Sequence, residues 1–229
     1  MRSVLPIVCS FFLFPPLFAQ VPLPESAWIG TGRVSAKINN KGALITHFQV
    51  PNSDGDGSPV VSSLGDISIW MGAVDPAGNL MLAIQRSAWA ASHFQGGFRG
   101  TPSSGGAWKV TKAEIDQHVK DFEADGDIDM VIPSIFSWPG QNNPHSLQWN
   151  GFPVDFSSSL YILGAPYADM NSDGIYDPAE GDFPFLGDVI YNLQYTPAEL
   201  VYIPFHTKES VSMRLDCSAV FFAYDCDEA

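Results

Sequence analysis

Positive charge is scarce in this sequence. Its 229 residues include 11 lysine and arginine residues against 25 aspartate and glutamate residues, which gives a formal net charge of −14. A surface that binds nucleic acid needs clustered lysine and arginine side chains to neutralise phosphates. The composition therefore argues against nucleic acid as a partner, and it agrees with the binding of divalent cations.

Long apolar stretches are also lacking, apart from one near the start of the chain. There Arg2 precedes an apolar stretch over residues 4–14, and the small residue Ala19 precedes Gln20. These are the features of a secretory leader, and the stretch is too short to span a bilayer as a helix. We expect residues 1–19 to be a signal peptide, the chain to be exported, and no transmembrane segment to follow.

Cysteine occurs three times, and Cys9 belongs to the expected leader. The remaining two, Cys217 and Cys226, invite a disulfide in an exported protein. Residues 218–224 between them read as one strand, however, and an extended chain rises by about 3.3 Å per residue. Because bridged cysteines need α-carbons within about 7 Å of each other, we do not expect a direct pair unless the segment folds back. Buried free thiols, or partners outside this chain, are the alternatives.

Turn-forming and aromatic residues are plentiful instead. The sequence has 20 glycines, 18 prolines and 13% aromatic residues against 16% charged residues. This mixture is typical of a turn-rich β protein rather than of a helical or disordered one. We predict a mainly β fold of antiparallel, sandwich-like sheets over residues 20–229. One short helix is expected, because Thr111 and Glu114 form a capping-box pattern ahead of an apolar face, and it should end near Asp125.

The clearest strands form a hairpin. Apolar residues alternate over residues 67–73 and again over 80–84, and the turn between them, Asp75-Pro76-Ala77-Gly78, has type I preferences. The glycine- and serine-rich residues 87–106 predict a long loop. Further strands are predicted over residues 35–45 around a turn at 39–42, and over 156–163, 189–193, 199–203, 211–215 and 218–224.

The last of these predicted strands, over residues 218–224, is apolar on both faces. Such a pattern predicts a strand inside a core and not one at the edge of a sheet. The sequence stops at Ala229, soon after this strand, and we interpret it as truncated at the C-terminus.

The most informative stretch runs from Asp169 to Glu180. Counted from Asp169, oxygen-bearing side chains occupy positions 1, 3, 5, 9 and 12, and glycine occupies position 6. This is the calcium-loop spacing of an EF-hand or dockerin repeat, in which the chain curls around a hard dication and position 7 offers its carbonyl oxygen. We therefore predict a Ca²⁺ site. Its ligands are Asp169, Asn171, Asp173, the carbonyl of Ile175, Asp177 and Glu180.

The residues around this loop predict that it lacks the EF-hand helices. Asp177 and Pro178 favour a single helical turn that carries Glu180 toward the ion, whereas Pro166 and the Phe183-Pro184 pair oppose longer helices. The expected role is structural, with the millimolar affinity of extracellular sites, because opening around an ion needs paired helices. Two similar runs, over residues 52–63 and 121–132, lack a carboxylate at position 12, and we interpret both as turns.

Six motifs carry a resemblance. They are Ile38-Asn39-Asn40 with Gly42, Ser68 to Gln85, Trp108 to Thr111, Trp138-Pro139-Gly140, Ala165 through the calcium loop to Asp188, and Ala219 to Tyr224. Together they resemble the N-terminal region of large secreted or surface proteins of Bacteroidetes that are exported by the type IX secretion system. The resemblance implies an extracellular, calcium-binding, mainly β region of uncharacterised activity. Such proteins usually end in a sorting domain, and without one the expected location is the periplasm.

No pattern in the sequence indicates a reaction. A Gly-x-Ser-x-Gly nucleophile turn and a His-Glu-x-x-His zinc motif are both missing, and the histidines occur singly. A glycosidase needs two carboxylates across a cleft, often with aromatic platforms. Residues that could supply these parts are Glu114, Asp127, Asp129, Trp89, Trp108 and Trp138, although core packing is the expected role of the tryptophans.

We therefore expect a non-catalytic, calcium-stabilised β module at the cell surface, whose further partner is a glycan or a surface protein. The alternative is a carbohydrate-binding module or a secreted glycoside hydrolase. A row of exposed aromatic side chains beside a groove would favour the alternative, whereas their uniform burial would favour a scaffold.

Overall fold

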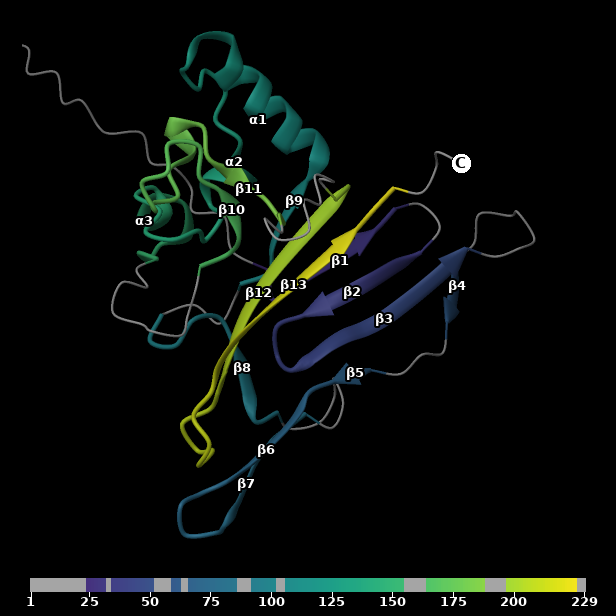
Figure 1. Cartoon of the computed structure of the whole chain (residues 1–229). Helices are drawn as coiled ribbons and strands as arrows, with labels where there is room; N and C mark the ends of the chain where they lie inside the picture. The colour runs from purple at the N-terminus through teal and green to yellow at the C-terminus, as the bar shows by residue number, and fades with distance from the viewer. Residues whose placement is uncertain are drawn as a thin grey trace, which may run out of the picture.

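A computed structural model describes residues 24–31, 34–51, 59–62, 66–85, 92–101, 106–154, 164–187 and 197–225. Within these residues the strands form four antiparallel sheets, so the predicted mainly β, sandwich-like fold is confirmed (Figure 1). No helix in the described part of the chain has the length and apolar character that a membrane crossing requires. The expected leader, the run at residues 52–58 and the strands expected at 156–163 and 189–193 lie outside the described residues.

The first sheet is built from the N-terminal strands. Its order is β1-β2-β3-β4, with β5 paired to β3. The predicted turn at residues 39–42 connects β2 to β3, and one face of the sheet places Ile29, Ala36 and Ile38 in a buried apolar cluster. The strands are β1 (Ser26–Gly30), β2 (Ser35–Asn39), β3 (Ala43–Pro51), β4 (Pro59–Ser62) and β5 (Ile67–Ser68).

The second sheet is organised around β12 (Glu199–Thr207). On one edge β12 pairs with β13 (Asp216–Ala223), and on the other with β8 (Phe94–Gly96) and β9 (Trp108–Thr111). Val201 and Ile203 pack against the first sheet, whereas Leu200 and Tyr202 face a second core on the opposite side. The strand buried on both faces is therefore β12.

Helices cover the face of β12 that lies away from the first sheet (Figure 1). The predicted helix is α1 (Lys112–Asp125), and its capping box is present because the Thr111 hydroxyl accepts from the Glu114 amide while the Glu114 carboxylate accepts from the Thr111 amide. It is the one helix of more than two turns in the described residues, and two short segments that were not predicted follow it, α2 (Pro133–Phe136) and α3 (Ser146–Asn150). Each is about one turn long, which is too short to leave an apolar periodicity in the sequence.

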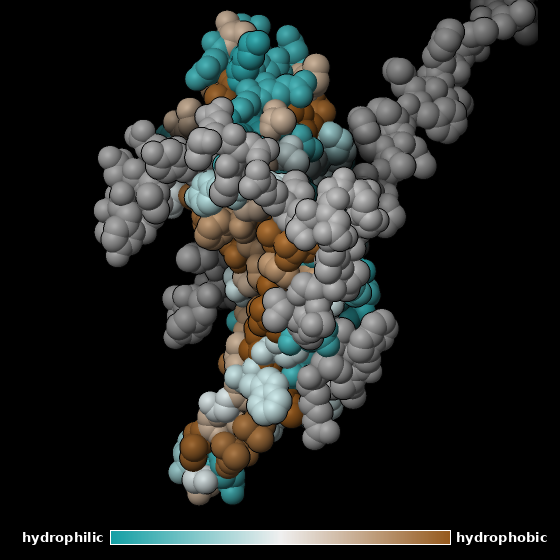
Figure 2. All heavy atoms as spheres, turned by 90° about the vertical axis from the view of Figure 1, so that its right-hand side faces the viewer, coloured by the Kyte–Doolittle hydropathy of each residue, from teal (hydrophilic) through white to brown (hydrophobic). Residues whose placement is uncertain are grey.

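The predicted hairpin is formed by β6 (Trp70–Val74) and β7 (Leu80–Ile84). The Gly78 amide donates to the carbonyl of Asp75 at 2.9 Å, which closes the predicted turn. Ala83 is fully buried, but the side chains of Leu80 and Leu82 are 68% and 47% exposed. One face of the hairpin, with Met71, Ala73, Met81 and Ala83, packs in an apolar cluster, whereas the other face leaves Trp70, Leu80 and Leu82 exposed. The brown lower end of Figure 2 is this hairpin.

Three further predictions need correction. The strand over residues 218–224 does exist as β13, but it stands at the edge of its sheet, because in the described residues only β12 pairs with it. Residues 211–215 form the bend between β12 and β13 rather than a strand. The loop expected over residues 87–106 contains β8, whose strand character comes from its pairing with β12. Cys217 lies in β13 as a free thiol, and Cys226 is outside the described residues.

Candidate calcium loop

The predicted calcium loop connects two short paired strands, β10 (Tyr167–Ala168) and β11 (Phe183–Pro184). Its centre is fixed to the protein core by Tyr176, which is fully buried. The Tyr176 hydroxyl donates to the carbonyl of Ile135 at 2.7 Å, and its amide donates to the carbonyl of Gln141 at 2.7 Å. Gly140 makes room for this ring, since a Cβ there would lie 2.5 Å from the Cβ of Tyr176. Both ends and the middle of the loop are therefore held by the body.

The first half of the loop curls around the side chain of Asp169. Asp169 Oδ1 accepts from the amide of Ser172 at 2.6 Å, and Oδ2 accepts from the amide of Gly174 at 2.9 Å. Asp173 Oδ1 accepts from the amide of Ile175 at 2.7 Å. Gly174 has a φ of 80°, in the left-handed region that glycine enters without steric cost. The sharp turn predicted at position 6 is therefore present.

Three of the predicted ligand side chains meet inside this curl. The Asn171 amide nitrogen donates to Asp173 Oδ2 at 3.2 Å and to Glu180 Oε2 at 2.6 Å. The residues at positions 3, 5 and 12 of the loop are thus in direct contact, although nine residues separate Asn171 from Glu180 in the sequence. The amide of Asn171 stands between the two carboxylates.

Asp177 is placed differently from the other predicted ligands. It caps the single helical turn η1 (Pro178–Glu180), as predicted, because its Oδ1 accepts from the amide of Ala179 at 2.9 Å. The same oxygen lies 3.0 Å from Nε2 of His145. The turn carries Glu180 back to Asn171.

Asp182 also helps to hold this loop, although it is not among the ligands that the spacing predicts. It is fully buried, and its two carboxylate oxygens accept from the amides of Met170 at 2.8 Å and Asp177 at 2.9 Å. It therefore ties the beginning of the loop to its end. Burial raises the pKa of Asp182, while these two hydrogen bonds oppose the shift. The one sequence signal for this role of Asp182 is that it lies two residues after the end of the predicted loop.

Negative charge is concentrated here. Burial, together with the charges of Asp169, Asp182 and Asp173, raises the pKa of the Tyr167 hydroxyl to about 12. Nevertheless, among the described residues no three histidine, cysteine, aspartate or glutamate side chains are grouped as they are around a metal ion. The hydrogen bonds explain this. The Asn171 amide separates two of the carboxylates, and the oxygens of Asp169 accept from backbone amides.

The chemistry of the donors can be compared with the ion that the sequence predicts. Calcium takes six to eight oxygen ligands at about 2.3–2.6 Å, from carboxylates, amide carbonyls and the backbone. The loop offers the carboxylates of Asp169, Asp173 and Glu180, and rotation of the Asn171 amide would turn its oxygen toward the same centre. Oxygen donors of these kinds are the ones that a hard dication prefers.

The weaker calcium candidate over residues 121–132 is a turn, as interpreted. Its first five positions lie in α1, whose backbone cannot curl around an ion. Asp121 instead accepts from the amide of Met130 at 2.9 Å, and Asp125 accepts from the amide of Asp127 at 3.1 Å.

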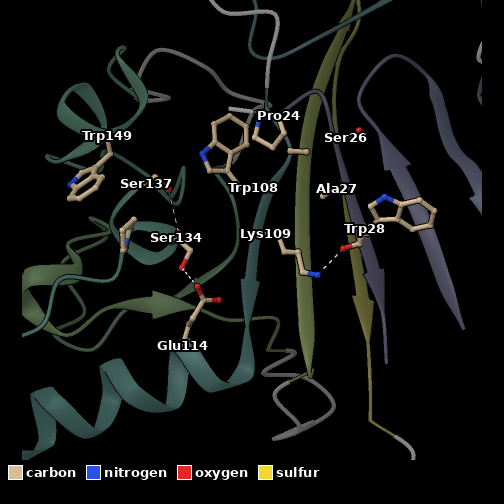
Figure 3. A pocket seen from close by; sticks show the side chains of 12 residues that line it. Pro24, Ser26, Ala27, Trp28, Trp108, Lys109, Glu114, Ser134, Ser137 and Trp149 are labelled. Carbon is tan, nitrogen blue, oxygen red and sulfur yellow. Dashed lines mark hydrogen bonds between the residues drawn. The ribbon is translucent and has the colours of Figure 1, made fainter. Parts of the chain in front are cut away.

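The tryptophans that the structure describes do not form one aromatic row. Trp108 and Trp138 are buried in the core, Trp28 is 42% exposed, and Trp89 lies outside the described residues. A cleft of about 550 Å³ lies between β1, β9 and α2, and Trp28, Trp108 and Trp149 line it. In Figure 3 the ring of Trp28 points away from the cleft, and its carbonyl accepts from Nζ of Lys109 at 2.8 Å.

This cleft gives little support to a hydrolase. Its one carboxylate among the described lining residues is Glu114. One oxygen of Glu114 accepts from the hydroxyl of Ser134 at 2.8 Å, and the other belongs to the capping box of α1 (Figure 3). Glycoside hydrolysis requires two carboxylates, one of which donates or accepts a proton. Glu114 is engaged in holding the helix.

Comparisons with known proteins return no family. No protein-family model, no curated protein and no solved structure gives a significant match to the chain.

Proposed function

We propose that this chain is a non-catalytic, calcium-stabilised β module of an exported protein, and that its ion lies in the loop over residues 169–180. The ligands are the side chains of Asp169, Asn171, Asp173, Asp177 and Glu180 with the carbonyl of Ile175. The observation that carries the proposal is the contact of Asn171 with both Asp173 and Glu180, at 3.2 Å and 2.6 Å. This contact joins positions 3, 5 and 12, which are three of the positions at which a calcium loop carries its ligands.

The ion's role is to hold the loop against the body. Without it, the like charges of Asp169, Asp173 and Glu180 repel one another across a short distance, and only hydrogen-bond donors offset the repulsion. With it, the repulsion is relieved, and the ion adds to the anchors that Tyr176 and Asp182 already provide. The module then presents its surface to a glycan or to a surface protein.

The proposal is tested by thermal unfolding of the purified chain in chelator, in calcium and in magnesium. At ten times a millimolar Kd, calcium should stabilise the fold by about 1.4 kcal/mol. For a chain of this length that raises the midpoint by about 3–6 °C. Magnesium should give a smaller shift, because it requires tighter octahedral geometry and retains its water. An unchanged midpoint, with no calcium retained on the protein, overturns the proposal.

Variants separate ion binding from general stability. Asp173→Asn and Glu180→Gln each remove a ligand charge and should abolish the calcium response. In chelator both variants should unfold at or above the wild-type midpoint, because each also removes repulsion. Glu123→Gln, an exposed change on α1, is the matched control and should keep the full response.

A further inference from the structure

The strand β13 lies at the edge of its sheet, yet its side chains are as apolar as those of a central strand. Both of its faces are apolar, and Phe222 is 50% exposed. One edge pairs with β12 from Glu199↔Ala223 to His206↔Asp216. In the part of the chain that the structure describes, no strand pairs with the other edge. Exposed edges present unpaired N–H and C=O groups to any strand that approaches, and apolar edges are uncommon in proteins that stand alone.

An apolar groove runs beside this edge. It has a volume of about 500 Å³, and consecutive residues from Phe221 to Tyr224 form one wall. Consecutive side chains of a strand point to opposite faces, so a groove that touches all four lies along the strand's edge. The opposite wall is the first sheet, through Ile38 of β2 and Ile45 of β3. Figure 2 shows apolar side chains gathered down the middle of the molecule's face on that side.

A hydrogen bond links the two walls of the groove. The Thr31 hydroxyl donates to the carbonyl of Tyr224 at 2.9 Å and so links the end of β1 to the end of β13. Val34, Ala36 and Ile38 are alternate residues that all line the groove, so they present one face of the chain around β2 to it. No charged side chain is among the described lining residues.

We propose that this groove accepts an extended segment of another polypeptide, which adds to β13 as a further strand of the second sheet. The edge requires backbone donors and acceptors spaced as in a strand, and the wall requires an apolar side chain at every second residue. A sugar would place hydroxyl groups against Ile38 and Ile45, and an acyl chain would leave the backbone of β13 unpaired. Since the chain carries a net charge of −14, a segment with basic ends is favoured. This inference goes beyond the proposed calcium site and does not depend on it.

The test uses a synthetic nine-residue peptide of alternating valine and threonine with a lysine at each end. Amide hydrogen exchange is measured on the purified protein with and without this peptide, in calcium and in chelator. Alone, every second amide of β13 should exchange rapidly, and the peptide should slow those amides. A peptide with proline at its centre should bind about tenfold more weakly, because proline cannot donate to the ladder and disturbs the strand.

Two variants localise the binding. Val34→Lys places a charge on the wall at an exposed position and should abolish protection of β13, whereas Leu80→Lys, an exposed change on the hairpin, should not alter it. If all β13 amides are already protected in a protein that light scattering shows to be monomeric, the edge is paired within the chain and the proposal is wrong. If Val34→Lys instead converts a dimer to a monomer, a second copy is the occupant, which also overturns it.

Discussion

At the residue scale, Asn171 has two roles in the proposed calcium site that a carboxylate could not combine. In the absence of an ion its amide nitrogen donates to Asp173 and Glu180 and so offsets their repulsion. In the presence of calcium the same side chain can offer its oxygen after rotation of the amide. The loop can therefore keep its curl in both states.

Replacement of Asn171 by aspartate should separate these roles. Asn171→Asp puts a third carboxylate against two others, so the midpoint of thermal unfolding in chelator should fall. The calcium affinity should rise, because ligand charge tunes the affinity of such loops. Calorimetric titration gives the affinity and thermal unfolding gives the midpoint. Equal responses of the variant and the wild type would show that Asn171 does not face the ion.

His118 makes a second residue-scale prediction, on pH. Burial lowers the pKa of His118 from the ordinary value of 6.5, against the opposing effects of the Asp182 carbonyl and the charge of Asp121. In the unfolded chain, His118 therefore takes up a proton near its ordinary pKa, whereas in the folded chain it does so only at lower pH. Stability is fully present above the unfolded pKa and is lost as the pH falls through it.

The expected observation is a decrease in the free energy of unfolding as the pH falls from about 7.5 to about 5.5. His118→Gln keeps a nitrogen near the carbonyl of Asp182 and cannot be protonated, so its decrease should be smaller. Urea unfolding at each pH measures both proteins. A decrease of the same size in the variant would assign the pH dependence to other groups.

At the element scale, the hairpin shows that residue size alone does not indicate the buried face. Ala83 packs in a cluster with Phe94, Phe205 and Met213, while Leu82 next to it faces outward. Leu82→Ser should change the free energy of unfolding by less than about 0.5 kcal/mol. Ala83→Leu overfills the cluster and should cost about 1–3 kcal/mol. Chemical denaturation of the two variants compares them, and the reverse order would mean that the hairpin presents its other face.

Elements with strong local signals could be predicted from the sequence. The capping box of α1, the turn of the hairpin and the cap of η1 each depend on residues within a few positions of one another. The curl of the calcium loop belongs with them, because Asp169 and Asp173 bind amides that are two to five residues away.

Elements that depend on distant partners could not be predicted. β8 is a strand because Gly96 pairs with Phe205, and Gly96 is needed there because a Cβ would meet the side chain of Asn40 at 2.3 Å. β12 and β13 are both apolar on two faces, so their patterns cannot tell which is central and which is at the edge. That difference arises from β8 and β9, which pair with β12 alone. The role of Asp182 could not be predicted either, because one of its partners, the amide of Met170, is 12 residues away.

At the scale of the whole molecule, β12 connects the first sheet to the helical layer. It pairs with three strands, and its two faces belong to the two larger apolar cores. A chain that ends at residue 197 keeps most of the elements but loses β12 and β13. Such a chain should show no cooperative thermal transition and should bind a hydrophobic dye, because neither core can close. A cooperative transition in this fragment would mean that one layer folds independently.

The position of β12 in the sequence also determines when the molecule can become compact. Synthesis delivers a chain from its N-terminus, so the first sheet and the helices emerge before the strand that both require. Until β12 has emerged, the apolar faces of the first sheet and of α1 lack the strand against which they pack. The two larger cores can close only after residue 207 has emerged, and chaperones that hold unfolded chains have the preceding interval in which to bind.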